Sequence, residues 1–171
     1  LTMSFPYCVG QCPVHYDVKM TGRPNPKSGK LPKYSSRYMH TPNDPLFPFG
    51  YGLSYTEFEY SDLKVLTPEV ELGGTVKVSV KVANKGKVAG DDVAQLYVRD
   101  LVAETTRPVR QLKGFKRLSL AAGEEIVVEF EIPTSDLAYC HRDMSFKADA
   151  GDFLVWVGAD SNASLEGEFT I

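Results

Sequence analysis

The sequence predicts an all-β protein, a β-sandwich preceded by an irregular, extended arm at the N-terminus. Two observations predict the sandwich: valines alternate with polar residues between Thr75 and Ala83, and weaker segments of the same kind recur after Tyr55. Alternation is typical of strands with one buried face, and short strands separated by turns are typical of a sandwich. A third observation predicts the arm, because eight of the eleven prolines lie in the first 48 residues, where no periodic pattern is sustained.

The arm is rich in aromatic residues, whereas disordered segments are poor in them, so we expect it to pack on a partner surface. Residues 25–33 differ, since turn-forming and charged residues there predict an exposed loop. Residues 45–56 read Pro-Leu-Phe-Pro-Phe-Gly-Tyr-Gly-Leu-Ser-Tyr-Thr. Prolines that fix φ and glycines that permit unusual φ/ψ stand among large apolar side chains, which indicates a shaped, docked connector.

The strands are predicted from period-two patterns. Four valines face one way in residues 75–83, and Ile126, Val128, Phe130 and Ile132 do the same in residues 124–132. Weaker alternation predicts strands over residues 58–66, 92–99, 144–149, 153–157 and 165–171.

One segment has a mixed pattern. Leu112, Phe115 and Leu118 are three residues apart, which fits a helix, but Gly114 interrupts them and the segment continues as a strand to Leu120. We therefore predict a β-bulge at Gly114. A helical turn is predicted only for residues 134–139, which follow a proline.

Charge and hydropathy exclude several classes of partner. The net charge is −3 and no basic block is present, so there is no electrostatic basis for binding nucleic acid or anionic lipid. No segment approaches the about 20 apolar residues that cross a bilayer. We therefore predict no nucleic-acid partner and no membrane partner. Because the chain starts at Leu1 without a leader or an initiator methionine, we expect a fragment or a processed product.

Three cysteines cannot all pair within one chain. In an extended segment the Cα atoms of Cys8 and Cys12 would lie roughly 13 Å apart, beyond the ~7 Å limit for a disulfide, so free thiols are expected unless the chain turns at Gly10. Together with His15 and Asp17 these cysteines could be imagined as metal ligands. Their spacing does not match structural zinc patterns, and small buried thiols are the favoured interpretation. We predict no metal and no cofactor.

Four stretches carry a family resemblance. Leu-Thr-Met-Ser-Phe-Pro opens residues 1–24, Ser-Ser-Arg-Tyr at 35–38 leads into the connector, Arg-Pro-Val-Arg-Gln-Leu-Lys-Gly-Phe-Lys-Arg-Leu spans 107–118, and Ala-Gly-Asp-Phe begins residues 150–161. Together they resemble the family 3 glycoside hydrolases, the β-glucosidases and their relatives. Departures from the family pattern occur at His15, Asp17, His40 and Ala122.

The resemblance implies a division of the chain. Residues 1–54 would be the C-terminal end of the family's α/β sandwich domain with the connector, and residues 55–171 its immunoglobulin-like, fibronectin type III-like domain. This family places its nucleophilic aspartate and its acid/base glutamate on domains upstream of the matched part. The resemblance therefore implies that this chain contains no catalytic residue.

The sequence itself announces no catalytic pair. Retaining glycosidases need two carboxylates about 5 to 5.5 Å apart. The pairs at residues 91–92 and 124–125 are adjacent in sequence, so in strands their side chains point to opposite faces, and we interpret them as solvated strand ends. His40 and His141 have no nucleophile in a recognisable elbow nearby, which favours interface or surface positions.

Two groups of residues remain as candidates for binding. Tyr38, Asp44, Phe47 and Phe49 could help to wall a sugar pocket near the active site, although the same aromatics could simply pin the arm between domains. A local basic cluster could dock a partner or contact sugar, but alternation spreads its members over two faces and favours ordinary solvation. Its members are Arg107, Arg110, Lys113, Lys116 and Arg117.

The leading hypothesis is a C-terminal, non-catalytic part of an exo-acting, β-glucosidase-like or β-xylosidase-like enzyme, periplasmic or secreted, that hydrolyses terminal β-linked sugars by a retaining mechanism. Its partners would be the upstream domains of the same enzyme, with a homodimer possible, and a small sugar would bind only through those domains. The alternative is a stand-alone immunoglobulin-like module that binds carbohydrate or protein. A third hypothesis, that the segment is itself catalytic, predicts hydrolysis of an aryl glucoside.

Overall fold

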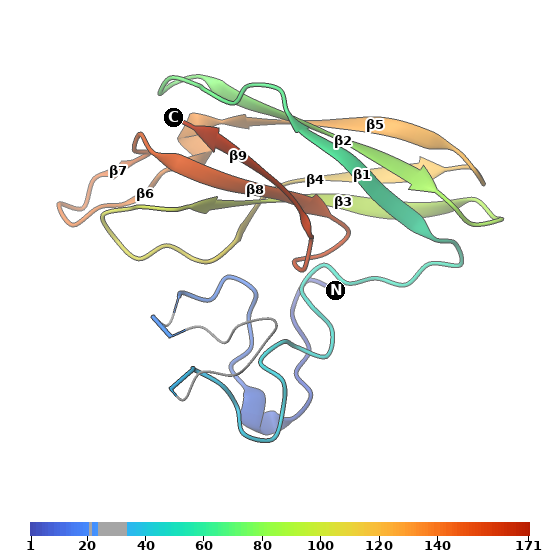
Figure 1. The fold of residues 1–171 in the computed structure, drawn as a ribbon, viewed down its shortest axis with the longest axis horizontal. Coiled ribbons are helices and arrows are strands. Elements are labelled where there is room, and N and C mark those ends of the chain that lie inside the picture. Colours follow the sequence, from blue (N-terminus) through green and yellow to red (C-terminus); the bar gives the residue numbers. More distant parts are fainter. Residues whose placement is uncertain (21, 24–33) are drawn as a thin grey trace.

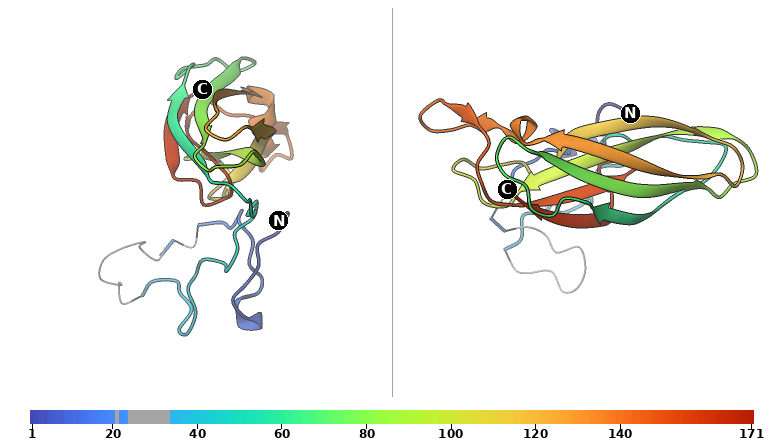
Figure 2. Two further views of the ribbon diagram at one scale, coloured as in Figure 1. Left: turned by 90° about the vertical axis from the view of Figure 1, so that its right-hand side faces the viewer. Right: turned by 90° about the horizontal axis from the view of Figure 1, so that it is seen from above.

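The computed structural model describes residues 1–20, 22–23 and 34–171, so the loop predicted at residues 25–33 lies outside the described residues. Within these ranges the chain forms a sandwich of two antiparallel sheets, with the arm on one side (Figures 1 and 2). The three-stranded sheet contains β1 (Phe58–Val65), β2 (Thr75–Asn84) and β5 (Glu125–Pro133) in the order β1-β2-β5. The four-stranded sheet has the order β4-β3-β8-β9, with β4 (Gln111–Leu120), β3 (Gly90–Asp100), β8 (Asp152–Gly158) and β9 (Leu165–Thr170). The prediction of an all-β sandwich is confirmed.

The core lies between the two sheets, because the alternating residues of each strand point inward. The four valines of β2 are fully buried there and pack against buried residues of both sheets, such as Leu96, Phe130 and Val155. In the register of the three-stranded sheet Val78 faces Phe130 and Val82 faces Ile126. The period-two pattern of the sequence is therefore the burial pattern of the fold.

The predicted bulge lies where β3 meets β4. Leu96 faces Gly114 but the next residue, Tyr97, faces Leu112, so Lys113 has no counterpart on β3. A Cβ at Gly114 would lie 3.2 Å from the Phe130 ring, so any larger side chain would require that ring to shift. At the bulge the alternation of inward- and outward-pointing residues on β4 shifts by one residue. This shift explains the helix-like spacing of Leu112, Phe115 and Leu118.

The segment after β5 differs from its prediction. The expected turn is present as a 3-10 helix, η2 (Thr134–Leu137), but the strand predicted over residues 144–149 is reduced to β7 (Phe146–Lys147). It pairs with β6 (Tyr139–Cys140), which the sequence did not predict. The backbone turns tightly between the two, and Met144 has a φ of 66° there, so neither strand can extend through the turn.

The arm is formed by two passes of the chain, joined by a β-bridge between Phe5 and Phe47. The Phe5 amide donates to the Phe47 carbonyl at 2.9 Å, and the Gly50 amide donates to the Leu1 carbonyl at 2.7 Å. A second bridge, between Lys19 and Pro108, joins the arm to the loop that precedes β4. The short 3-10 helix η1 (Val9–Gln11) lies on the first pass, away from the sandwich (Figure 1).

Candidate functional site

Two arm aromatics cover the outer face of the four-stranded sheet. Tyr16 and Phe49 stack with their ring centroids 4.4 Å apart, and Tyr16 meets the edge of Tyr97 at 5.7 Å. The Leu112 amide donates to the Tyr16 hydroxyl at 3.2 Å. Tyr97 and Trp156 are buried beneath them, although both lie on the face opposite the core. The arm therefore finds part of its partner surface on the sandwich itself, and not only on another domain.

The connector is held against the same sheet by backbone contacts. The Ser161 amide donates to the Phe49 carbonyl at 2.9 Å, and Gln95 of β3 donates to the carbonyls of Gly50 and Ala159. Gly50 has a φ of +86° and its Cα faces the Gln95 amide so closely that a Cβ would collide with it. Glycine is required at this position of the connector for both reasons.

Arg110 locks the loop before β4 to the loop after β8. Its guanidinium stacks on the Trp156 ring at 4.2 Å and donates to the carbonyls of Ser161 at 2.7 Å and Ala163 at 2.8 Å. The Trp156 indole in turn donates to Glu166 at 2.7 Å. Burial lowers the pKa of Arg110 from its ordinary value, yet arginine remains charged at neutral pH.

The solvated interpretation of the basic cluster is therefore wrong for part of it. Arg110 is half-buried, and Arg107 lies 4.6 Å above the Tyr139 ring and donates to Gln111. Lys116 and Arg117 are exposed as expected. The bulge on β4 lies between the two half-buried arginines, which precede it, and the two exposed cations, which follow it.

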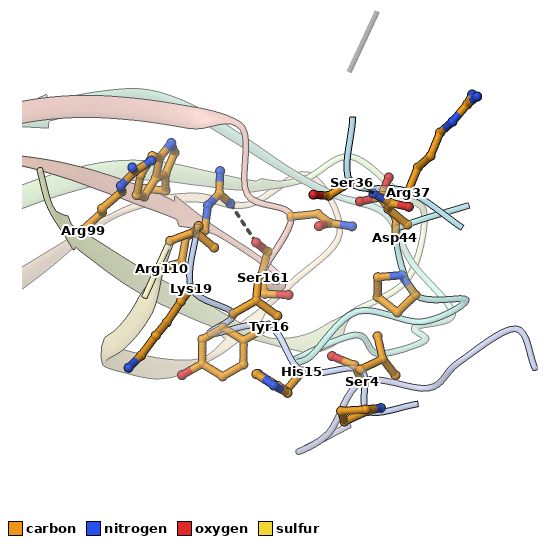
Figure 3. Close-up of a pocket in the computed structure, with 18 of the residues that line it drawn as sticks. Ser4, His15, Tyr16, Lys19, Ser36, Arg37, Asp44, Arg99, Arg110 and Ser161 are labelled. Carbon is orange, nitrogen blue, oxygen red and sulfur yellow. Dashed lines mark hydrogen bonds between the residues drawn. The ribbon is translucent and has the colours of Figure 1, made fainter. Parts of the chain in front are cut away.

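A cleft of about 750 Å³ lies between the arm and the outer face of the sheet (Figure 3). His15, Tyr38 and Asp44 line it from the arm, and Arg99 and Arg110 line it from the sandwich. It combines aromatic rings, cations and carboxylates within one concave surface. Apolar and aromatic walls with a few charged groups are common in pockets that bind small molecules.

The structure separates the four residues predicted to lie near substrate. Tyr38 and Asp44 line the cleft, whereas Phe47 and Phe49 do not. Phe47 packs on Tyr51 at 4.9 Å inside the arm, and Phe49 is stacked on Tyr16. Thus the two phenylalanines have structural contacts within this chain, while the tyrosine and the aspartate are both exposed at the cleft.

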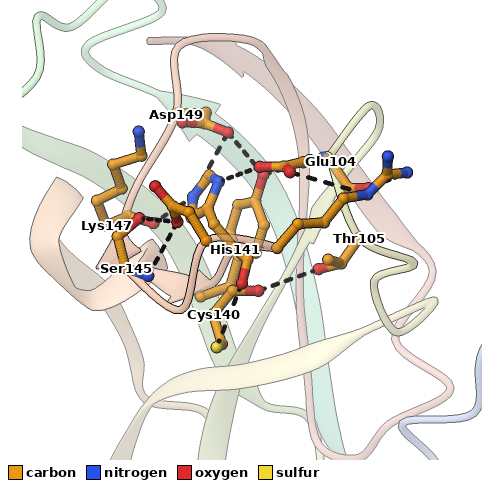
Figure 4. A network of polar contacts seen from close by, with 10 residues as sticks. Glu104, Thr105, Cys140, His141, Ser145, Lys147 and Asp149 are labelled. Atoms are coloured by element: carbon orange, nitrogen blue, oxygen red, sulfur yellow. Dashed lines mark hydrogen bonds and ion pairs between the residues drawn. The ribbon is translucent and has the colours of Figure 1, made fainter.

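A buried histidine lies just after β6, in a network of polar contacts with the loop between β3 and β4 (Figure 4). His141 is only 4% exposed, and its Nδ1 lies 2.7 Å from a carboxylate oxygen of Glu104. Its ring stacks on Tyr139 at 4.2 Å, and the Tyr139 hydroxyl donates to Asp149 at 2.6 Å. These contacts tie the β6–β7 hairpin to the loop between β3 and β4.

The interpretation of His141 as an interface or surface residue was wrong, whereas His40 is exposed. Sequence reasoning missed the network because His141 and Glu104 are 37 residues apart in the chain. The available signal was the alternation of Tyr139, Cys140 and His141, since two buried rings flank an exposed residue at the end of β6.

The adjacent carboxylates Asp91 and Asp92 lie in different surroundings. Asp91 is exposed and accepts hydrogen bonds from Ser119 and Arg117, which lower its pKa. Asp92 instead accepts a bond of 2.6 Å from Tyr60 of the facing sheet, so the solvated interpretation is wrong for Asp92. Burial, followed by this bond, raises the pKa of the Tyr60 hydroxyl. The two carboxylates thus point to opposite faces, as predicted.

The three cysteines are free thiols, as expected, and all are exposed in this chain. Burial of Cys8 and Cys12 against an upstream domain stays a prediction. Among the described residues no group of three His, Cys, Asp or Glu side chains is arranged to hold a metal ion.

A helix long and apolar enough to span a bilayer is likewise not found in the described ranges.

Comparison with known proteins assigns the sandwich first. Residues 92–161 match the model of the fibronectin type III-like domain. The chain is 45% identical over 172 residues to a periplasmic β-glucosidase of Salmonella typhimurium, which covers the whole chain and 22% of that protein. It is 44% identical over 164 residues to a β-xylosidase of Formosa agariphila, covering 95% of the chain and 21% of that protein.

Solved structures agree with these sequence matches. The β-glucosidase of Listeria innocua in complex with glucose superimposes with a TM-score of 0.92 and 38% identity, covering 99% of this chain and 24% of that one. The fold and the arm thus define a fibronectin type III-like sandwich domain of a glycoside hydrolase. The chain belongs to the family 3 glycoside hydrolases, where it corresponds to a C-terminal segment of the β-glucosidases and β-xylosidases. It spans roughly a fifth to a quarter of the length of the relatives it matches.

Proposed function

We propose that this chain is the non-catalytic, bracing part of an exo-acting β-glycosidase that hydrolyses terminal β-linked sugars by a retaining mechanism. The single observation that carries the bracing role is the apolar surface of the arm that the sandwich leaves uncovered. Met3, Val9 and Met39 are 61%, 89% and 79% exposed, although the arm is docked through Tyr16 and Phe49. An exposed apolar surface of this kind marks an interaction site.

The partner of this surface is the domain that precedes residue 1 in the whole enzyme. We place the end of that α/β domain and the connector at residues 1–54, and the fibronectin type III-like domain at residues 55–171. The first strand, β1, begins at Phe58, which supports this division. A homodimer would add a second copy to the same assembly, and the name of the Salmonella relative favours a periplasmic or secreted enzyme.

Tyr38, Asp44, Phe47 and Phe49 form the part of the segment that we assign to the neighbourhood of the substrate. Tyr38 and Asp44 offer a ring and a carboxylate at the cleft, which suits the hydroxyl groups and apolar faces of a sugar. Phe47 and Phe49 act behind them by fixing the connector. The sugar itself would be held mainly by the upstream domains.

The test compares the isolated chain with the full-length enzyme. The isolated chain should neither hydrolyse an aryl β-glucoside nor give a heat of binding with glucose or xylose in calorimetry. In the full-length enzyme, but not in the isolated chain, residues 1–50 should resist protease as well as residues 55–171 do. Hydrolysis by the isolated chain would disprove the non-catalytic role, and equal resistance of its arm would disprove the bracing role.

The cleft supports a second candidate, a stand-alone immunoglobulin-like module that binds carbohydrate or protein directly. Its aromatic and charged lining is the observation in its favour. This candidate requires measurable affinity from the isolated chain, so the same calorimetry distinguishes it from the bracing role.

A further inference from the structure

Gln11 is a buried polar side chain of the arm that bonds both to its own turn and to a distant segment of the chain. Gln11 is 1% exposed and ends the short helix η1. Its Oε1 accepts a hydrogen bond of 2.8 Å from the Tyr7 amide, which closes the first pass of the arm on itself. Its Nε2 points the other way, toward the second pass.

The second pass presents backbone carbonyls to that amide group. Nε2 of Gln11 lies 3.0 Å from the Pro42 carbonyl and 2.9 Å from the Asp44 carbonyl, with the Asn43 carbonyl at 3.4 Å. A primary amide has two N–H donors, so two of these bonds can be made at once. A buried N–H donor that loses its acceptor costs free energy, because no water is present to replace that acceptor.

The backbone of Gln11 makes the third connection to the same loop. The Tyr38 hydroxyl donates to the Gln11 carbonyl at 2.9 Å. Within the loop, the Asn43 side chain accepts from the Tyr38 amide at 3.1 Å and donates to the Ser36 carbonyl at 2.8 Å. Tyr38 and Asp44, the two ends of this loop that face the cleft, are thus both bonded to a single buried residue.

From this geometry we infer that Gln11 is the positioning residue that fixes Tyr38 and Asp44 at the cleft. The inference rests on the proposed function only in that Tyr38 and Asp44 are taken to lie near the sugar. The alternative holders of the loop are weaker: Asn43 is exposed, and the bridge between Phe5 and Phe47 lies beyond the end of the loop. Loss of the Gln11 side chain would free Pro42 and Asp44 from these bonds. The bond of the Tyr38 hydroxyl to the backbone carbonyl of residue 11 and the bond of the Ser36 amide to the Arg23 carbonyl, at 2.8 Å, would remain.

The sharpest test is Gln11→Glu, which keeps the shape and replaces the two donors by a carboxylate. In its ionised form that carboxylate would face three carbonyl oxygens, whereas at acidic pH it protonates and regains one donor. In the 171-residue chain, cleavage by chymotrypsin or exchange of amide hydrogens in residues 36–44 should accelerate at least tenfold at neutral pH. Exchange, corrected for its intrinsic pH dependence, should recover partly at pH 4 in Gln11→Glu and not in Gln11→Ala.

The matched control is Gln111→Glu, which introduces the same charge on β4 beside Arg107 and should leave the loop unchanged. If exchange in residues 36–44 is as fast in the unchanged chain as in Gln11→Glu, the inference is wrong. It is equally wrong if Gln11→Ala does not accelerate that exchange.

Kinetics of the full-length enzyme separate the inference from the proposed function. Tyr38→Ala or Asp44→Ala should lower kcat/KM, and if neither does, the proposed site fails whatever Gln11 does to the loop. If they do lower it, Gln11→Glu should lower kcat/KM at least tenfold at neutral pH and less at acidic pH, relative to the unchanged enzyme. A Gln11 variant that frees the loop but leaves kcat/KM unchanged would overturn the positioning role.

Discussion

The guanidinium of Arg110 lies 4.2 Å from the centre of the Trp156 ring, on the face of the sheet that the arm covers. It joins a loop that precedes β4 to a loop that follows β8, and Tyr16 and Phe49 pack on the same cluster. The arm packs against the sandwich at this cluster, so substitutions here test how the arm is held.

Arg110→Lys should destabilise the chain by about 1–3 kcal/mol, because lysine cannot stack its charge flat on the indole and donate to two carbonyls together. Urea unfolding measures the loss. Arg117→Lys on the same strand is the control and should change stability by less than about 0.5 kcal/mol, since Arg117 pairs with Asp91 at the exposed surface. Equal losses in the two variants would contradict the role given to Arg110.

Tyr16→Ala should release the arm from the sheet. Trp156 is the only tryptophan of the sequence and is 5% exposed, so its fluorescence reports whether the arm covers it. We expect a shift of the emission to longer wavelength and faster proteolysis of residues 1–50, with residues 55–171 still folded. Tyr55→Ala, at a fully exposed ring, should change neither signal. An unchanged emission in Tyr16→Ala would show that the arm is held elsewhere.

Asp100→Asn should stabilise the chain at neutral pH. Burial raises the pKa of Asp100, while its Oδ1 accepts from the Val102 amide, a bond that asparagine can keep. Because the folded state holds the proton more tightly than the unfolded state, the stability of the unchanged chain falls as pH rises from the ordinary pKa of the carboxyl through the raised one.

The gain from Asp100→Asn should therefore be largest at pH 7 and shrink towards about pH 3, where the carboxyl is mainly protonated in both states. Thermal unfolding at the two values of pH measures it. Asp136→Asn removes the same charge from an exposed position and serves as the control. A gain for Asp100→Asn that is independent of pH would show that the buried charge is not its cause.

His141→Ala should destabilise the chain by about 2–4 kcal/mol, since it removes a buried ring stacked on Tyr139 and leaves Glu104 and Asp149 without their shared partner. Denaturant unfolding measures the change, and amide exchange should rise first in the β6–β7 hairpin. His40→Ala is the control at an exposed histidine and should be neutral. A neutral effect of His141→Ala would mean that the network does not hold the hairpin.

The sequence alone specifies the two-layer β fold, because period-two alternation shows directly which face of a strand is buried. It also placed the bulge at Gly114, since an extra residue reverses that alternation, and the motif-rich connector indicated the family. These features depend on neighbours in the chain, and such local rules can be read without a structure.

The three-dimensional structure was needed to show which polar residues are buried. Arg110, His141 and Gln11 look like ordinary surface residues in sequence, yet each is held by partners at least 31 residues away in the chain. It likewise separated Tyr38 and Asp44, which line the cleft, from Phe47 and Phe49, which do not. Burial of a polar group depends on whether distant segments bring it hydrogen-bond partners, and the folding of the whole chain settles that pairing.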